Sequence, residues 1–372
     1  MTLKARIACL FYLCLGSFLP ASGNEIQTIT QILPPWGIET AFSSGFIIPH
    51  HLDMQVYTNR HLSIMEFSLR IPTDGSRAWH HAYHFPERGW SYLYSSLGNS
   101  EILGDVHGIQ TWIRFPLVRS GNSSLHLKPG LGLGWFRKVF DPRTNYKNLA
   151  IGSHLNVNLG LSAEYRIELS EQCFAGLRAG LVHFSNGTIV TPNYGINIPT
   201  MGVTFGWQQR RVWKPARIHQ DTLKNKTLIC IGMAAGTKQI LPAGGRSYAV
   251  ASFSLCATYR FFANGALGAG IDFFLDSSDE LILSRKGKET PHSLSLVKPG
   301  LKVIRSWEIG RFAFDFQLGC YLGGKDQSDG SVYDILEMRY FMFKQWYLSC
   351  FLKTHYAKAD FIGWGSGWAF GK

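Results

Sequence analysis

Several long segments of the chain alternate between apolar residues and polar or small residues. In residues 153–167, "SHLNVNLGLSAEYRI", every odd position from Leu155 to Ile167 is apolar, and every even position is polar or small. Residues 251–260 and 312–322 show the same alternation. A period of two is typical of a β-strand with one apolar face. A strand that crosses a bilayer needs about 9–11 residues, and each of these segments is long enough.

The composition favours strands that lie in a membrane. After residue 23 no run reaches the roughly 18 apolar residues of a helical span, yet the chain is 14% aromatic and only 17% charged. In residues 359–372, Trp364 and Trp368 share an apolar face opposite glycines, as in the aromatic girdle of a membrane protein. We therefore predict an all-β fold, an outer-membrane antiparallel β-barrel that is apolar outside and polar inside. The alternative is a secreted soluble sandwich or lipocalin-like barrel, whose strands also alternate.

The N-terminal residues predict export. Lys4 and Arg6 precede the apolar run "IACLFYLCLGSFL", and small residues follow it in "PASGNE". This order is typical of a secretory signal peptide, here residues 1–23. The formal net charge of +12 then becomes +10, since Lys4 and Arg6 leave with the signal. Because the chain is exported and has no run of five basic residues, we expect an anionic membrane surface as its partner, and no nucleic acid.

The two halves of the chain resemble each other. The tripeptide Lys-Pro-Gly at 128–130 recurs at 298–300, and His183 recurs as His355 before a second strand rich in glycine and aromatic residues. Two eight-stranded barrels in tandem are the simplest architecture, and a single barrel of about 14 to 16 strands is the alternative. The predicted divisions are a signal peptide at 1–23, a barrel at 24–209, a linker at 210–226 and a second barrel-like half at 227–372.

The segment 173–185, "CFAGLRAGLVHFS", carries two polar residues on its apolar face. The odd positions are apolar until His183 and Ser185, while Arg178 and glycines occupy the even positions. The odd face is therefore expected to point toward lipid. Residues i and i+2 of a strand project from one face about 6.5 Å apart, so an imidazole–hydroxyl hydrogen bond forms readily. The same parity places Asn197 beside His183 across a hairpin, with Pro199 as a candidate position for a bulge.

This pair has the chemistry of acyl transfer. His183 can take the proton of Ser185, which then attacks an ester carbonyl. Asn197 is the candidate third residue that orients the imidazole through its amide oxygen. The candidate oxyanion donors are the amides of Asn186 and Gly187, or the Asn186 side chain. The alternative is a histidine that merely sits at the membrane interface, where a polar-tipped ring is tolerated.

The stretch resembles the signature of a known family. "HFSNG" at 183–187, followed by "PNYGIN" at 192–197, is similar to the motif of the lipid A 3-O-deacylases (PagL), also called acyloxyacyl hydrolases. The resemblance covers about residues 37–209. It implies an eight-stranded outer-membrane barrel that hydrolyses an ester-linked acyl chain of lipid A with a Ser–His pair. The second half resembles this barrel only loosely.

Carried onto this chain, the resemblance makes Ser185 the nucleophile and His183 the base, with Asn186 and Gly187 at the oxyanion hole. The family's third residue is typically a glutamate, where this chain has Asn197. The second half has "HYAK" in place of "HFSN", so its counterpart of Ser185 is Ala357. The apolar set of its strand is at even positions, from Trp346 to Leu352, so His355 is expected to face inward.

We therefore predict an outer-membrane lipid A deacylase, a carboxylic ester hydrolase whose partners are lipopolysaccharide and the membrane. Arg137, Lys138 and Arg143 are candidates for holding the lipid phosphates, although they are equally typical of ordinary loop charge. No cofactor and no metal are expected, because Ser–His hydrolysis needs none and the five cysteines after the signal show no CxxC spacing. The alternative function is a non-catalytic barrel that binds lipopolysaccharide or serves as a channel.

Overall fold

Over the residues that it describes, the computed structural model consists of β-strands joined by loops, with three short helical segments. It describes residues 36–58, 60–209, 227–262, 264–287, 296–324, 330–356 and 358–371. The helical segments are η1 (Leu52–Val56), α2 (Ala78–Ala82) and α3 (Asp279–Arg285). None of the helices in these ranges is long and apolar enough to cross a membrane. The predicted signal peptide (1–23) and linker (210–226) lie outside the described residues.

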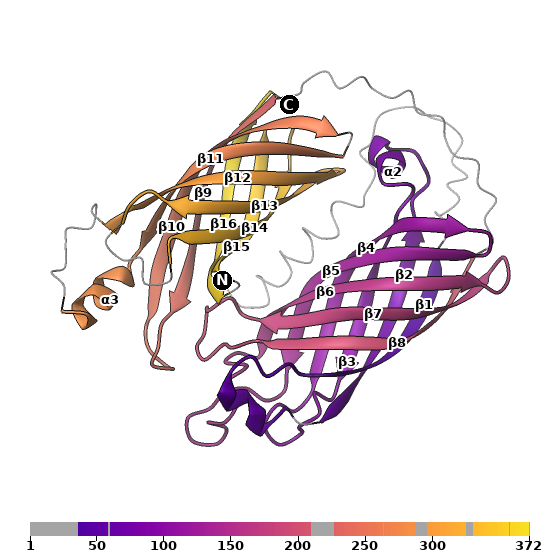
Figure 1. Cartoon of the computed structure of the whole chain (residues 1–372), viewed down its shortest axis with the longest axis horizontal. Helices are drawn as coiled ribbons and strands as arrows, with labels where there is room; N and C mark the ends of the chain where they lie inside the picture. Colours follow the sequence, from indigo (N-terminus) through magenta and orange to yellow (C-terminus); the bar gives the residue numbers. More distant parts are fainter. Residues whose placement is uncertain are drawn as a thin grey trace. The chain divides into compact units, whose positions relative to one another are not determined.

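The first eight strands form one closed antiparallel barrel (Figure 1). Each strand pairs with the next, and β8 closes the barrel by pairing with β1. The strands are β1 (Gly37–Phe46), β2 (His61–Pro72), β3 (Glu87–Ser95), β4 (Val106–Ser120), β5 (Ser123–Phe136), β6 (Leu155–Glu168), β7 (Cys173–Ser185) and β8 (Ile196–Gln208).

The next eight strands form a second closed antiparallel barrel, which β16 completes by pairing with β9. They are β9 (Thr227–Gln239), β10 (Ser247–Phe262), β11 (Gly265–Asp276), β12 (Lys298–Ile309), β13 (Phe312–Tyr321), β14 (Val332–Phe341), β15 (Trp346–His355) and β16 (Lys358–Phe370). The prediction of two eight-stranded barrels in tandem is confirmed. The single larger barrel is wrong, because each group of eight strands closes on itself.

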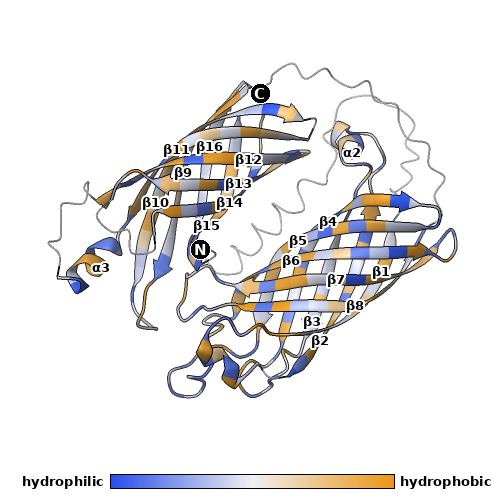
Figure 2. Cartoon of the chain, in the orientation of Figure 1, coloured by the Kyte–Doolittle hydropathy of each residue, from blue (hydrophilic) through white to orange (hydrophobic). Residues whose placement is uncertain are grey.

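The alternating pattern of the sequence separates an apolar outer wall from a polar lumen. Along β6, the odd residues face outward and the polar even residues, such as Asn158, Glu164 and Arg166, are buried. Figure 2 shows the same alternation along the strands of both barrels. In mid-strand, the side chain of Met201 in the first barrel is 74% exposed, and that of Val303 in the second is 60% exposed. An apolar wall this extensive is typical of a surface that contacts lipid.

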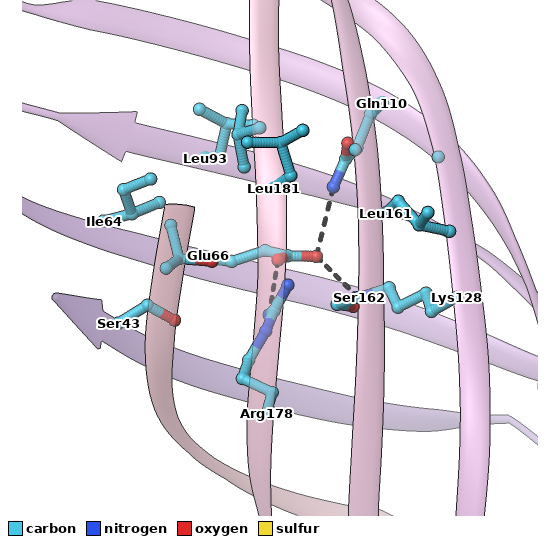
Figure 3. Close-up of a pocket in the computed structure, with 14 residues that line it drawn as sticks. Ser43, Ile64, Glu66, Leu93, Gln110, Lys128, Leu161, Ser162, Arg178 and Leu181 are labelled. Carbon is cyan, nitrogen blue, oxygen red and sulfur yellow. Dashed lines mark hydrogen bonds and ion pairs between the residues drawn. The ribbon is translucent and has the colours of Figure 1, made fainter. Parts of the chain in front are cut away.

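Ion pairs fill the lumen of the first barrel. Arg114 binds Glu39 at 2.7 Å and Glu164 at 2.6 Å, and Glu66 binds both Lys128 and Arg178 at 2.7 Å. Because a buried charge without a partner is strongly destabilising, this mutual pairing lets the barrel enclose so many charges. A cavity of about 20 Å³ lies beside Glu66 (Figure 3). That volume holds about one water molecule, so side chains and not a channel occupy this part of the lumen.

The two ends of the first barrel differ. One end carries the loops 47–60, 96–105, 137–154 and 186–195, and the other carries the turns 121–122 and 169–172 together with the loop 73–86. Beneath the first set of loops lies an apolar core that includes Leu103, Phe136, Ile151, Phe184 and Ile196. Both ends of the barrel's own chain, at β1 and β8, lie at the opposite end with the short turns.

The second barrel repeats this plan. Its lumen holds ion pairs such as Lys302–Asp272 at 2.7 Å and Arg339–Asp315 at 2.6 Å. Its turn 310–311 lies at one end, and the segments 277–287 and 322–324 lie at the other. Its described cysteines, like Cys173 in the first barrel, are free.

Candidate active site

The hairpin of β7 and β8 places three polar side chains together on the outer wall of the first barrel. His183 pairs directly with Asn197 across the two strands, and Ser185 follows two residues later on the same face. The register continues unbroken through the pair Leu181 and Pro199, so Pro199 forms no bulge. His183 is half-buried, and Ser185 is only 8% exposed.

The three side chains form a hydrogen-bonded line. His183 Nε2 lies 3.0 Å from Ser185 Oγ, and His183 Nδ1 lies 2.7 Å from Asn197 Oδ1. An amide oxygen only accepts, so Nδ1 carries the ring proton and donates it to Asn197. Nε2 then presents its lone pair to the Ser185 hydroxyl. This is the tautomer that a general base needs in order to activate a serine.

The backbone N–H and the side-chain amide of Asn186 both make hydrogen bonds to loop residues. The backbone N–H of Asn186 donates to Asn193 Oδ1 at 3.1 Å, and its side-chain Nδ2 donates to Ser153 Oγ at 2.9 Å and Val190 O at 3.0 Å. The candidate oxyanion donors on Asn186 are therefore already engaged. Gly187 has a φ of +61°, a conformation that favours glycine.

Gly195 is a site residue that the sequence analysis did not single out. A Cβ at this position would lie 3.1 Å from His183 Cε1, 3.0 Å from the carbonyl oxygen of Phe184 and 3.4 Å from Ser185 Cβ. Its φ is +77°. Both facts favour glycine here, since a side chain would press on the histidine. Gly195 belongs to the sequence motif "PNYGIN" at 192–197, and this motif is the signal that could have identified it.

His50 is a second residue that the sequence analysis missed. Its Nδ1 lies 3.5 Å from Asn197 Nδ2, and its Nε2 lies 2.8 Å from the carbonyl oxygen of Tyr194. The neighbouring His51 stacks on the Tyr194 ring, with centroids 4.0 Å apart. Burial and repulsion from His50 lower the pKa of His51. No pattern in the sequence signalled His50, which is separated from Asn197 by 147 positions.

The three predicted phosphate-binding residues lie in the loop 137–154, at the same end of the barrel as Ser185. Arg137 is paired with Asp105 at 2.8 Å, and its side chain is 70% exposed. Lys138 Nζ donates to the carbonyl oxygen of Glu101 at 2.7 Å. Arg143 is exposed, and its backbone N–H donates to Asp141 Oδ1 at 2.8 Å. These contacts keep the charges at the barrel's rim, and none of them joins the Ser185–His183 pair.

The corresponding histidine of the second barrel lies inside its lumen. His355 is buried, and its Nε2 lies 2.9 Å from the Tyr321 hydroxyl and 3.4 Å from Lys353 Nζ. Its predicted inward direction is therefore observed. Among the described residues, no group of three or more His, Cys, Asp or Glu side chains is arranged to hold a metal ion.

Comparison with protein families gives two matches. The family described as lipid A 3-O-deacylase (PagL) matches residues 65–208, and the acyloxyacyl hydrolase C-terminal domain matches residues 227–372. The first match contains His183, Ser185 and Asn197 and begins after His50. The search of curated proteins gave no match.

Solved structures give weak likenesses. Neisserial surface protein A is 10% identical, with a TM-score of 0.31, over 47% of this chain and 97% of its own. The outer membrane enzyme PagL is 18% identical, with a TM-score of 0.29, over 45% of this chain and 97% of its own. A mutant porin of Rh. blastica is 8% identical, with a TM-score of 0.18, over 90% of this chain and 99% of its own. At these TM-scores the likenesses carry no weight in assigning function.

Proposed function

We propose that this chain is an outer-membrane lipid A deacylase. The premise is that it belongs to the lipid A 3-O-deacylase (PagL) family through residues 65–208 and carries the acyloxyacyl hydrolase C-terminal domain at 227–372. The protein hydrolyses an ester-linked acyl chain of lipopolysaccharide. The observation that carries the proposal is the hydrogen-bonded line Ser185–His183–Asn197 on the outer wall of a barrel.

The reaction follows the logic of a serine esterase. His183 Nε2 takes the proton of Ser185 as Oγ bonds to the ester carbonyl carbon, and His183 then gives that proton to the departing sugar oxygen. The acyl group remains on Ser185. A water molecule, deprotonated by His183, attacks this new ester, and the fatty acid leaves as Ser185 regains its proton. Asn197 holds the imidazole in place, but as a neutral group it stabilises the imidazolium less than a carboxylate does.

The oxyanion of the tetrahedral intermediate needs N–H donors next to Ser185. Because Asn186 already uses its amide and side chain within the loop, we assign the leading role to the Gly187 amide. The Asn186 amide contributes only if its bond to Asn193 is exchanged for the oxyanion. Serine–histidine hydrolysis requires neither a metal nor a cofactor.

The position of the site suits a lipid substrate. Outer-membrane barrels have short periplasmic turns and longer extracellular loops. The end with the turns 121–122 and 169–172 is therefore periplasmic, and Ser185, at the opposite end, meets the outer leaflet. Leu181 and Leu161 form a directly paired, exposed apolar couple just below His183. They offer a wall for the acyl chains, while Arg137, Lys138 and Arg143 at the rim bind the phosphates.

The alternative of a channel is disfavoured for both barrels by their lumens, where ion pairs between strands occupy the interior. The division into a catalytic barrel at 24–209, a linker at 210–226 and a second half at 227–372 remains our interpretation. We assign the second half a non-catalytic role, since its histidine faces inward and its counterpart of Ser185 is Ala357.

The test is to mix the purified protein, in detergent, with lipid A and to follow acyl loss by mass spectrometry. Wild type is expected to release one fatty acid, and Ser185→Ala is expected to release none. Ser44→Ala is the control, because Ser44 is an outward serine of the same barrel, on the exposed face of β1. Equal activity of the Ser185→Ala variant and wild type, or no acyl loss from any lipid A by the folded protein, would overturn the proposal.

A further inference from the structure

We propose that His50 is a positioning residue that determines which nitrogen of His183 carries the proton. It acts by fixing the orientation of the Asn197 amide. The catalytic consequence rests on the proposed function, whereas the effect on the ring proton does not. His50 belongs to the loop after β1 and lies before the residues that match the deacylase family.

An asparagine in the third position creates a problem that a carboxylate does not have. A carboxylate accepts with either oxygen, but an amide accepts with one end and donates with the other. With Asn197 Oδ1 toward His183, Nδ1 holds the ring proton and Nε2 is free to act as a base. With the amide turned over, its N–H would donate to Nδ1 and move the proton to Nε2. Ser185 would then face a donor that cannot take its proton.

The contacts of His50 select the productive orientation. The carbonyl oxygen of Tyr194, 2.8 Å away, can only accept, so His50 Nε2 carries a proton. In the neutral imidazole, Nδ1 is then an acceptor. The end of the Asn197 amide that faces it at 3.5 Å must be the donor Nδ2. This leaves Oδ1 for His183 at 2.7 Å.

One competing contact limits this arrangement to neutral His50. The carbonyl oxygen of Ile48 lies 3.2 Å from the same Nδ1, and it would accept a hydrogen bond from the N–H at that position in the imidazolium form. Protonated His50 has no lone pair for Asn197. The proposed role therefore belongs to the neutral ring.

Backbone hydrogen bonds fix the segments around Asn197 and Tyr194, two residues that the His50 ring contacts. The N–H of Ile48 donates to the carbonyl oxygen of Asn197 at 2.9 Å, which ties the loop after β1 to the start of β8. The N–H of Tyr194 donates to the carbonyl oxygen of Leu149 at 3.2 Å. The ring of His50 thus spans two anchored segments, so its position relative to Asn197 follows from the closure of the barrel.

The first arm of the test is kinetic. His50→Phe keeps a ring but removes the acceptor, and we expect kcat on lipid A to fall about five- to tenfold with KM unchanged, as for the loss of one neutral hydrogen bond. His50→Asn restores an acceptor near the position of Nδ1 and is expected to restore kcat. His51→Phe is the matched control, because His51 stacks on Tyr194 and that contact survives the change.

Comparing the effect of His50→Phe in the wild-type chain with its effect in the Asn197→Asp variant separates a positioning role of His50 from a structural one. In Asn197→Asp the third residue is a carboxylate, so adding His50→Phe is expected to change kcat less than about twofold. A structural role of His50 would give the same loss in both backgrounds, and that result would overturn the proposal.

The second arm reads the proton directly and needs no activity. In protein labelled with ¹⁵N-histidine, the His183 signals, identified by their loss in His183→Phe, are expected to show Nδ1 protonated in wild type. The His50→Phe variant is expected to show a mixture of the two tautomers. An unchanged His183 spectrum in this variant would overturn the proposal. If the His183 tautomer changes as expected between wild type and His50→Phe but the wild-type protein releases no fatty acid, the result would instead contradict the proposed function alone.

Discussion

The two barrels share one topology but place their corresponding histidines on opposite sides of the wall. In β7 the odd residues face outward, so His183 reaches the outer surface and meets Asn197 across the hairpin. In β15 the even residues Leu348 and Leu352 form the outward apolar set, so the odd residue His355 turns inward. A shift of one residue in the pattern exchanges the two faces of a strand. The same hairpin can therefore hold either a lipid-facing site or part of a buried network.

The partner strand strengthens this difference. The pairing of β15 with β16 shifts between Lys353 and Thr354, and Asp360 is the extra residue of this bulge. Its carboxylate binds Lys353 at 2.5 Å and Lys238 at 2.6 Å inside the lumen. The hairpin of β7 and β8 has no such shift. Bulges redirect side chains, and here the bulge supplies an anion that binds two buried lysines, of which Lys238 also binds Asp276.

The largest effect is expected from replacing the two histidines separately. His183→Ala removes the proposed general base, and kcat on lipid A should fall about 10²- to 10⁴-fold. His355→Ala should leave kcat unchanged, because this side chain faces the lumen of the other barrel. Fatty acid release by the two purified variants checks the comparison. A large loss in His355→Ala would mean that the second barrel contributes directly to catalysis.

The next effect concerns the stability of the second barrel. Asp360→Ala removes the carboxylate that the buried Lys353 binds, whereas Lys238 keeps Asp276, and we expect the free energy of unfolding of this barrel to fall by about 3–5 kcal/mol. Glu280→Ala, at an exposed position of α3, is the control. Denaturant unfolding in detergent gives the measurement. Deacylation should persist under folding conditions, and equal stability of the two variants would contradict the structural role of Asp360.

The sequence predicts the direction in which the strand side chains point, because the pleat of a strand determines it. Alternation alone placed His183, Ser185 and Asn197 outward and His355 inward, because successive side chains must point to opposite faces. The apolar outer residues of β6 and its buried polar residues follow from the same rule. Two barrels were predicted as the simplest architecture because the pattern repeats in both halves, but alternation alone does not separate them from one larger barrel, and the closure of each set of eight strands decided it.

What could not be predicted comes from closure and from loops. His50 reaches Asn197 because β1 pairs with β8, a contact between the ends of the barrel that no local period encodes. Asn186 was predicted as an oxyanion donor, yet the loop uses its amide to bind Asn193. Hydrogen bonds within an irregular loop depend on its full conformation, so residue type and spacing alone do not reveal them.

A charge on the outer wall tests whether both barrels lie in a bilayer. Met201→Arg and Val303→Arg each place a cation at the middle of an exposed, apolar strand face. Each should cost about 2–4 kcal/mol of folding stability in lipid, and much less if that surface faces water. Unfolding from lipid vesicles measures both costs. A cost confined to Met201→Arg would show that only the first barrel spans the membrane.

The smallest effect is expected at the rim of the first barrel. Arg143→Ala removes an exposed cation near the proposed position of the lipid phosphates, and KM for lipid A should rise about two- to fivefold with kcat unchanged, as for the loss of one surface ion pair. The difference should shrink in high salt, because salt screens exposed charges. Arg246→Ala, which removes an exposed cation from the second barrel, is the matched control and should leave KM unchanged. Equal KM values for both variants and wild type at low salt would remove Arg143 from the substrate site and make it ordinary loop charge. An equal rise in both variants would instead show that the charge of the whole protein, and not a built phosphate site, draws the lipid to Ser185.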